Sequence, residues 1–243
     1  MTEYAVRITR LYYTYPDGTR ALEAIDLDVH TGEHVALVGP SGAGKSTLLL
    51  HLNGILTGTG TVKIMGKSLD GADLLEIRRQ VGLVFQDPND QLFCPTVFED
   101  IAFGPLNLSV PTDEIPRRVD KALLDVGLEL SHRLRSSHHL SMGERKRAAL
   151  ASVLVMEPAI LALDEPSTNL DPRNRRHLIE MLGGTSSSLI LATHDLEMVL
   201  ALCPRTVVME RGKIWADGNT RDLLSNASLM DEHGLEVPHS LRG

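Results

Sequence analysis

Residues 39–46 read Gly-Pro-Ser-Gly-Ala-Gly-Lys-Ser, which matches the pattern G-x-x-x-x-G-K-[ST]. A continuous apolar run, residues 35–38, precedes this loop, and helical periodicity follows it over residues 45–54. Glycines let successive backbone N–H groups turn inward around a phosphate, and the N-terminus of the helix adds its partial positive charge. The segment therefore predicts a phosphate-binding loop between a buried strand and a helix.

Two residues of this loop have distinct expected roles. Lys45 is expected to meet the β- and γ-phosphates of a nucleotide, and the Ser46 hydroxyl is expected to ligate Mg²⁺. The residues expected to hold the nucleotide along this loop are Gly39, Pro40, Ser41, Gly42, Ala43, Gly44, Lys45, Ser46 and Thr47.

The succession of strand and helix recurs further along the chain. Apolar runs at 160–163 and 189–192 are followed by helical periodicity at 173–182 and 195–202. Continuous apolar runs are typical of parallel strands that are covered on both faces. The alternation predicts an α/β fold with a mostly parallel sheet.

Two other regions have different patterns. Residues 4–15 and 22–29 alternate apolar and polar side chains around a Pro-Asp-Gly turn, which predicts an N-terminal antiparallel hairpin. From about Asp87 to Leu140 no run predicts a buried strand, and helical signals occur at 97–103 and 113–126. This middle region is predicted to be a helical insertion into the α/β core.

The bulk properties argue against several classes of protein. A net charge of −8 opposes nucleic acid as a main partner, because binding to phosphate backbones needs clustered Lys and Arg. Two cysteines predict no disulfide framework and favour a reducing cytosol. Met1 leads into a strand-like segment rather than a secretory signal, and the longest apolar stretch, residues 148–156, is far below the ~20 residues that span a bilayer.

Acidic residues and a histidine follow the later apolar runs. Asp164 ends the run at 160–163, so its carboxylate is expected at the ligand-binding edge of the sheet, where it suits a second Mg²⁺ contact. Glu165 comes next and is able to orient or deprotonate an attacking water. His194 ends another core strand at the equivalent edge and is expected near the γ-phosphate.

Further motifs occur in order along the whole chain. They are Tyr15, the loop at 39–47, Gln86, Leu-Ser-Met-Gly-Glu at 140–144, Ile-Leu-Ala-Leu-Asp-Glu-Pro at 160–166, Asn-Leu-Asp at 169–171 and His194. In this order they resemble the ATP-binding subunits of ABC transporters over nearly the full length.

The resemblance implies a fold, cofactors and an activity. It implies a P-loop NTPase of the ABC-ATPase type that binds ATP and Mg²⁺ and hydrolyses ATP. One domain over residues 1–226 would carry a helical subdomain at about 87–155, followed by a short tail at 227–243. Tyr15 looks like the aromatic residue that stacks on adenine, with Tyr13 as the alternative.

The resemblance also assigns roles to single residues of the catalytic machinery. Gln86 looks like the residue that contacts Mg²⁺ and the attacking water, and Glu165 looks like the catalytic base. His194 is similar to the switch histidine of the family, and Asp171 to the aspartate that communicates between the sites of two subunits.

In the family, the motif at 140–144 contacts ATP that is bound to the opposite subunit. The resemblance therefore implies two subunits paired head-to-tail around two ATPs, with a second ATPase subunit that is an identical chain or a paralogue. Ser141 and Gly143 match the motif and are expected to hold nucleotide. Met142 replaces the usual glycine and Glu144 the commonest glutamine, and a methionine costs backbone freedom if its φ is positive.

The segment at 85–105 resembles the ATPases of cobalt, nickel and energy-coupling-factor (vitamin) importers, as do His138-His139 and residues 234–238. This branch implies integral membrane scaffold and substrate-binding subunits as partners, no nucleic acid, and a peripheral place on the cytoplasmic face of the cell membrane. The histidine pair is not expected to bind metal, because adjacent histidines point apart and no third ligand is evident. Leu92 and Phe93 are each expected under the insertion, but as a group they resemble a groove for a helix of the membrane subunit.

The sequence opposes three other classes of protein. An ABC-type ATPase acting on DNA would need a long coiled-coil insertion, and the sequence has no sustained heptads. A ribosome-acting ATPase would usually carry two cassettes and basic linkers, which one cassette and a net charge of −8 oppose. Intact Lys45, Glu165 and His194 oppose an inactive regulatory subunit.

Overall fold

The computed structural model describes residues 3–69 and 74–242. The chain divides into two compact units. The first unit comprises Met1–Leu83, Ala159–Glu165 and Ser186–Gly243, and the second comprises Val84–Pro158 and Pro166–Thr185.

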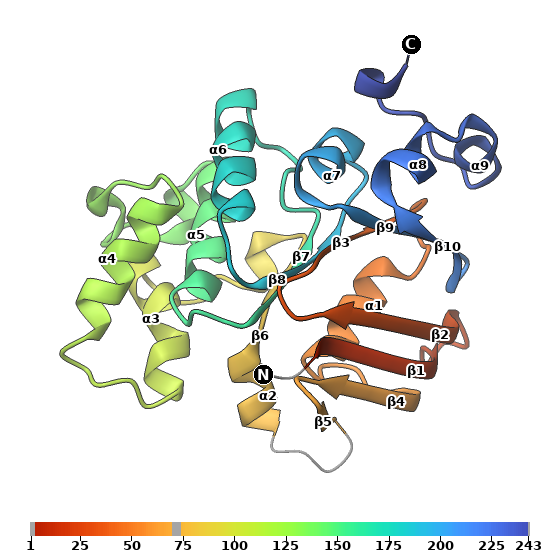
Figure 1. Cartoon of the computed structure of the whole chain (residues 1–243). Helices are drawn as coiled ribbons and strands as arrows, with labels where there is room; N and C mark the ends of the chain where they lie inside the picture. The colour runs from red at the N-terminus through yellow and green to blue at the C-terminus, as the bar shows by residue number, and fades with distance from the viewer. Residues whose placement is uncertain (1–2, 70–73, 243) are drawn as a thin grey trace. The chain divides into compact units, whose positions relative to one another are not determined.

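The smaller sheet of the first unit is antiparallel and has the strand order β2-β1-β4-β5 (Figure 1). In β2, Ile25, Leu27 and Val29 are buried while Asp26 between them is exposed, because successive side chains of a strand point to opposite faces. The predicted N-terminal hairpin is confirmed. The strands of this sheet are β1 (Tyr4–Thr14), β2 (Arg20–His30), β4 (Thr59–Ile64) and β5 (Lys67–Ser68).

The larger sheet of the first unit has the strand order β10-β9-β3-β8-β7-β6. β3 runs parallel to β8 and β9, β7 runs parallel to β8, and β10 pairs antiparallel with β9 at one edge. Every residue of β7 and β8 is buried, which confirms the interpretation of the continuous apolar runs. The strands are β3 (His34–Val38), β6 (Val81–Val84), β7 (Ile160–Asp164), β8 (Ser188–Ala192), β9 (Arg205–Glu210) and β10 (Lys213–Asn219).

Helices of the first unit connect these strands and form its C-terminal part. The predicted helices after β3 and β8 are present as α1 and α7. The elements are α1 (Lys45–Leu52), α2 (Leu74–Gln80), α7 (Leu196–Leu202), α8 (Thr220–Ser225), α9 (Ala227–Glu232) and the 3-10 turn η4 (His239–Leu241).

The second unit consists mainly of helices, and α3, α4 and α5 pack against one another (Figure 1). Their contact faces are apolar, with Ile101, Val119, Leu123 and Ala148 at most 1 % exposed. The helices expected in the middle region are confirmed. The elements of this unit are η1 (Pro88–Asp90), α3 (Val97–Asn107), α4 (Ile115–Asp125), η2 (Leu130–His132), η3 (Ser137–His139), α5 (Met142–Leu154) and α6 (Pro172–Gly183).

None of the helices within residues 3–69 and 74–242 is long and apolar enough to cross a bilayer.

Candidate functional site

The glycine loop joins β3 to α1 within the first unit. Gly39 has φ +149°, and a Cβ there would lie 1.9 Å from the carbonyl oxygen of Met209. Gly44 has φ +102°, and its Cβ would lie 2.6 Å from the carbonyl oxygen of Ala21. The loop therefore packs so closely on neighbouring backbone that only glycine fits at these two positions.

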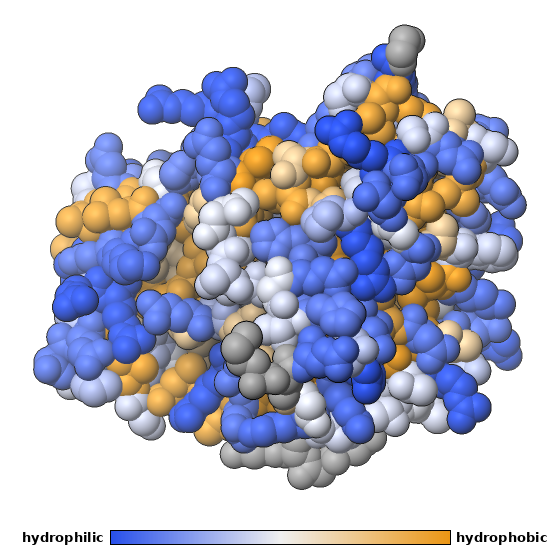
Figure 2. All heavy atoms as spheres, in the orientation of Figure 1, coloured by the Kyte–Doolittle hydropathy of each residue, from blue (hydrophilic) through white to orange (hydrophobic). Residues whose placement is uncertain are grey.

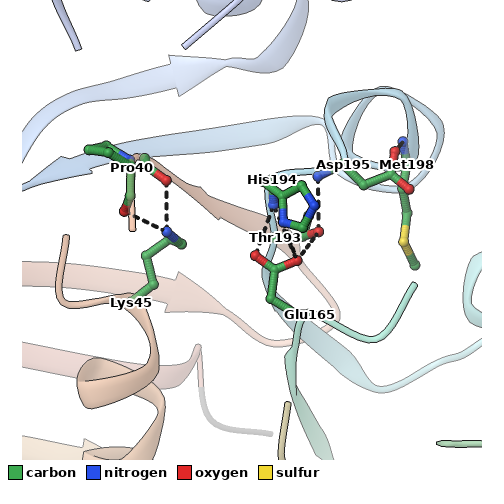
Figure 3. Close-up of polar contacts among 8 residues, drawn as sticks. Pro40, Lys45, Glu165, Thr193, His194, Asp195 and Met198 are labelled. Atoms are coloured by element: carbon green, nitrogen blue, oxygen red, sulfur yellow. Dashed lines mark hydrogen bonds and ion pairs between the residues drawn. The ribbon is translucent and has the colours of Figure 1, made fainter. Parts of the chain in front are cut away.

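Lys45, the first residue of α1, is buried beneath the loop. Its Nζ donates hydrogen bonds to the carbonyl oxygens of Gly39 at 2.7 Å and Pro40 at 3.0 Å (Figure 3). Burial lowers the pKa of Lys45, while the carboxylates of Glu165 and Asp164 act in the opposite direction. The ammonium group is thus held at the loop, with two acidic side chains near enough to influence it.

A groove of about 230 Å³ runs along the loop. Tyr15 lines this groove, and its hydroxyl lies 3.0 Å from the Oγ1 atom of Thr47 on α1. Tyr13 packs edge-on against Tyr15, with ring centroids 4.9 Å apart, and does not line the groove. The groove is lined by Tyr15, Thr19, Arg20, Ala21, Gly42, Ala43, Gly44, Lys45, Ser46 and Thr47.

Glu165 follows β7 in a conformation that few side chains adopt. Its φ is +47°, in the left-handed region, and its N–H donates to the carbonyl oxygen of Ala192 on β8 at 2.8 Å. A non-glycine residue is strained in the left-handed φ/ψ region and stays there only where neighbouring groups hold it. Residues with such backbone strain are often found at functional sites. The hydrogen bond to β8 therefore helps to hold Glu165 in this backbone conformation.

The Glu165 side chain is buried and accepts hydrogen bonds from two consecutive residues (Figure 3). Thr193 Oγ1 donates to Oε2 at 3.0 Å, and the His194 N–H donates to Oε1 at 3.1 Å. The His194 Nδ1 lies 2.8 Å from Oε2, although 69 % of that side chain is exposed. The structure thus brings Glu165 and His194 together, and it adds Thr193, which the sequence analysis did not identify.

The oxygen donors of Asp164 and Ser46 are of the kind that Mg²⁺ prefers. Asp164 is the buried last residue of β7, and Ser46 is exposed at the start of α1. In the part of the chain that the structure describes, no group of three or more His, Cys, Asp or Glu residues is arranged to hold a metal ion. One carboxylate and one hydroxyl fit a Mg²⁺ ion, since this ion usually takes its other ligands from water and phosphate oxygens.

The remaining expected site residues belong to the second unit. Gln86 is exposed in the segment between β6 and η1. Ser141 is the N-cap of α5, where its Oγ accepts from the Glu144 N–H at 3.3 Å and the Glu144 side chain accepts in return from the Ser141 N–H at 2.8 Å. This reciprocal capping box holds the first turn of the helix in place.

Met142 and Gly143 both lie in the first turn of α5. The φ of Met142 is not positive, so the methionine at this position has no left-handed backbone strain. A Cβ on Gly143 would lie 3.6 Å from Leu170 Cδ2, an ordinary contact, and its φ is not positive. The fold of this unit therefore does not require a glycine at position 143.

Asp171 is the N-cap of α6 in the second unit. Its Oδ1 accepts from the backbone N–H groups of Arg173 at 2.9 Å and Asn174 at 3.0 Å. The bonds from Asn174 are the main cause of a lowered pKa of Asp171. Its carboxylate is therefore ionised at neutral pH and aligned with the start of the helix.

Similarity to known proteins agrees with this geometry. The family model described as ABC transporter matches residues 22–168. The energy-coupling factor transporter ATP-binding protein EcfA of Carboxydothermus hydrogenoformans is 45 % identical over 238 residues, which cover 96 % of this chain and 87 % of that protein.

Solved structures share the fold. The structure of cbiO1 from Clostridium perfringens, described as part of the ABC transporter complex cbiONQ, has 37 % identity and a TM-score of 0.80, covering 95 % of this chain and 94 % of that one. A dimeric structure of the ATP-binding cassette MJ0796 bound to ADP and Pi has 26 % identity and a TM-score of 0.82, covering 88 % and 98 % of the two chains. These similarities agree with the ordered motifs and with the acidic residues at the strand edge beside the loop. This chain therefore belongs to the ABC transporter family, as an ATP-binding protein that is an ATPase.

Proposed function

We propose that this chain hydrolyses ATP at the loop between β3 and α1, with Glu165 as the catalytic base. The observation that carries this proposal is the buried Glu165 carboxylate, held by Thr193 and His194. It sits at the end of a parallel strand and influences Lys45 of the phosphate loop. Ligands of such sheets bind at the carboxyl ends of the strands.

The nucleotide would lie along the groove beside the loop. Its phosphates would face the backbone N–H groups of the loop and the start of α1, and phosphate oxygens would replace the carbonyl oxygens that Lys45 now contacts. The adenine would stack on Tyr15, which the Thr47 hydroxyl holds at the edge of the groove. Tyr13 supports Tyr15 from behind rather than lining the groove.

Mg²⁺ would be held by Ser46 and Asp164. The family resemblance alone supports Gln86 as a further Mg²⁺ contact. When bound, the ion would neutralise charge on the phosphate oxygens during transfer. Glu165 would orient the attacking water and accept its proton. The His194 side chain, which contacts Oε2 and is 69 % exposed, would lie on the solvent side of this carboxylate.

Ser141 and Gly143 would bind the ATP of a second subunit, so that two subunits close head-to-tail around two nucleotides. Gly143 supports this, because the chain itself does not require a glycine there and the missing Cβ leaves room for a ligand at a helix N-terminus. Asp171 would communicate between the two sites. The cassette MJ0796, of similar fold, forms a dimer with ADP and Pi. We propose that the second subunit here is another copy of this chain, with a paralogue as the alternative.

The ATPase would power an importer of cobalt, nickel or a vitamin from the cytoplasmic face of the membrane, together with integral scaffold and substrate-binding subunits. The resemblance of residues 85–105 and the similarity to EcfA support this branch. Apolar side chains reach the surface in the region of α3 and α4 (Figure 2). Phe93, before α3, is 66 % exposed, and Phe103 on α3 is 47 % exposed. Such a surface is typical of a protein–protein contact.

The test of the catalytic proposal is the substitution Glu165→Gln. Turnover of ATP should fall by about 100-fold or more, because a general base contributes on this order, while ATP should still bind. The matched control is Glu232→Gln, which changes an exposed glutamate of α9 and should leave turnover unaltered. Hydrolysis by the Glu165→Gln variant at the unsubstituted rate would show that another group is the base.

A further inference from the structure

We infer that Gln91 is a positioning residue for ATP hydrolysis, because its side-chain amide connects the segment that carries Gln86 to α5. The inference rests on the role proposed for Gln86 as a contact of Mg²⁺. The residues whose contacts carry the inference all lie in the second unit.

The side-chain amide of Gln91 forms hydrogen bonds at both of its polar atoms. Gln91 directly follows η1 and is half-buried. Its Oε1 accepts from the Phe85 N–H at 3.2 Å. Its Nε2 donates to the Ala149 carbonyl oxygen at 2.7 Å and to Ser152 Oγ at 2.9 Å. Neither a carboxylate nor an apolar side chain could form both sets of bonds, because they need one acceptor and two donors.

Ser152 on α5 is oriented to accept one of these bonds. Its Oγ donates to the Ala149 carbonyl oxygen at 2.9 Å. A hydroxyl has one proton and two lone pairs, so the Ser152 oxygen is left to face Gln91 as an acceptor. The donors and acceptors are therefore matched when the nitrogen of the Gln91 amide points to α5 and its oxygen points to Phe85.

The segment is also attached to α5 on the other side of Gln86. Asp87 Oδ1 accepts from the Asn89 N–H at 2.9 Å and so caps η1. Asn89 Oδ1 accepts in turn from Arg145 Nη1 of α5 at 2.9 Å. This contact is exposed to water, whereas the bonds of Gln91 are partly buried. The bonds of Gln91 should therefore contribute more to holding the segment.

Gln86 itself is exposed and lies between these two attachments to α5. Helix α5 begins at the residues proposed to bind the ATP of a second subunit, Ser141 and Gly143. Gln91 would therefore keep Gln86 at a fixed distance from that second nucleotide contact. Without Gln91, Gln86 would contact Mg²⁺ for a smaller fraction of the time, so kcat should fall. The affinity for ATP should change little, because the phosphate loop and its groove belong to the first unit.

The experiment measures kcat and KM for ATP in the Gln91→Leu variant. The kcat should fall by about tenfold or more, because a small displacement of a positioned group is costly in rate. The KM should stay within about twofold of the unsubstituted value, because the groove is intact. The matched control is Gln80→Leu, the same change at a half-buried glutamine of α2, which should alter neither constant. A kcat of Gln91→Leu equal to that of the control would overturn the inference.

A double-substitution cycle separates positioning from general damage to the fold. If Gln91 acts through Gln86, adding Gln91→Leu to Gln86→Ala should lower kcat no further. A full additional loss in that background would overturn the inference. Should Gln91→Leu fail to fold, Gln91→Glu takes its place in the cycle. Its carboxylate can still accept from Phe85 but cannot donate to Ala149, so the same results are expected.

Amide hydrogen exchange tests the contact without catalysis. The Phe85 N–H should exchange about tenfold faster in Gln91→Leu than in the unsubstituted protein, while the amides of α5 keep their rates. Unchanged exchange at Phe85 would overturn the inference. If Gln86→Ala alone leaves kcat unaltered, the proposed role of Gln86 fails. Exchange at Phe85 then still decides whether Gln91 holds the segment, so the two failures are distinguishable.

Discussion

At the scale of single residues, His51 behind the phosphate loop links folding to pH. It is 1 % exposed on α1, and its Nδ1 donates to the Thr47 carbonyl oxygen at 2.7 Å, while Nε2 has no hydrogen-bond partner among the residues that the structure describes. Burial lowers the pKa of His51 below its usual 6.5. A charged ring would therefore be costly in this position, one turn after Thr47 on the helix that begins at Lys45.

The sign of the pH effect follows from the depressed pKa. Below pH 6.5 the unfolded chain binds a proton at His51 that the folded chain does not, so the free energy of unfolding should fall as pH drops. The contribution of one group cannot exceed about 1.4 kcal/mol per pH unit. In urea unfolding between pH 7 and pH 5, the His51→Gln variant should lose less stability than the unsubstituted protein. An equal loss in both would contradict this account of His51.

Candidate site residues stand out in the sequence where they belong to contiguous motifs, as Lys45 and Glu165 do, or follow a buried strand, as His194 does. Thr193 could have been predicted from its position, because a hydroxyl next to the predicted switch residue His194 is a candidate hydrogen-bond partner for Glu165. The contact of His132 Nε2 with Glu144 Oε1 at 3.1 Å could not be predicted, because the two residues are 12 positions apart and the turns between η2 and α5 bring them together.

At the scale of helices and strands, prediction works best for the apolar runs of β3, β7 and β8. These runs lie within one residue of the strand bounds, which add only the polar residues His34, Asp164 and Ser188. β9 is not predicted, although its four central residues are buried. β10 was missed because its pattern alternates between exposed and half-buried residues and includes Gly218 and Asp217. α3 continues to Asn107, beyond the predicted end at 103, and so contains Pro105, which lacks the backbone N–H that would donate to the Ile101 carbonyl oxygen.

The segment between η1 and α3 carries a prediction about the membrane partner. Leu92 is buried, as expected for a core residue, whereas Phe93 is 66 % exposed and packs edge-on against Phe103 at 5.0 Å. Phe93→Asp should therefore change the free energy of unfolding by only about 0.5 kcal/mol or less, while it should abolish co-purification with membrane subunits from the native host. Hydrolysis of ATP by the chain alone should persist.

The control for this surface is Leu124→Asp, which introduces the same charge at a residue of α4 that is 58 % exposed. It should retain the membrane subunits. If Phe93→Asp unfolds the protein, the side chain belongs to the core, and if it retains the partners, the docking surface lies elsewhere.

At the scale of the whole molecule, the proposed ATP sites are divided between two chains. The first unit supplies the loop, Asp164, Glu165 and His194, and the second supplies the α5 N-terminus with Ser141 and Gly143. The family and the fold follow from the sequence and its relatives. Which cargo is carried could not be predicted, because none of these residues would touch it.

The most direct test of the account is the mass of the Glu165→Gln variant in solution with and without Mg²⁺ and ATP. Sedimentation equilibrium should give one chain without nucleotide and two chains with it, because the bound γ-phosphate would join the loop of one copy to Ser141 and Gly143 of the other. With Lys45→Ala added, the mass should remain that of one chain. A single-chain mass for the Glu165→Gln variant, at ATP concentrations shown by calorimetry to saturate it, would contradict the pairing of two copies.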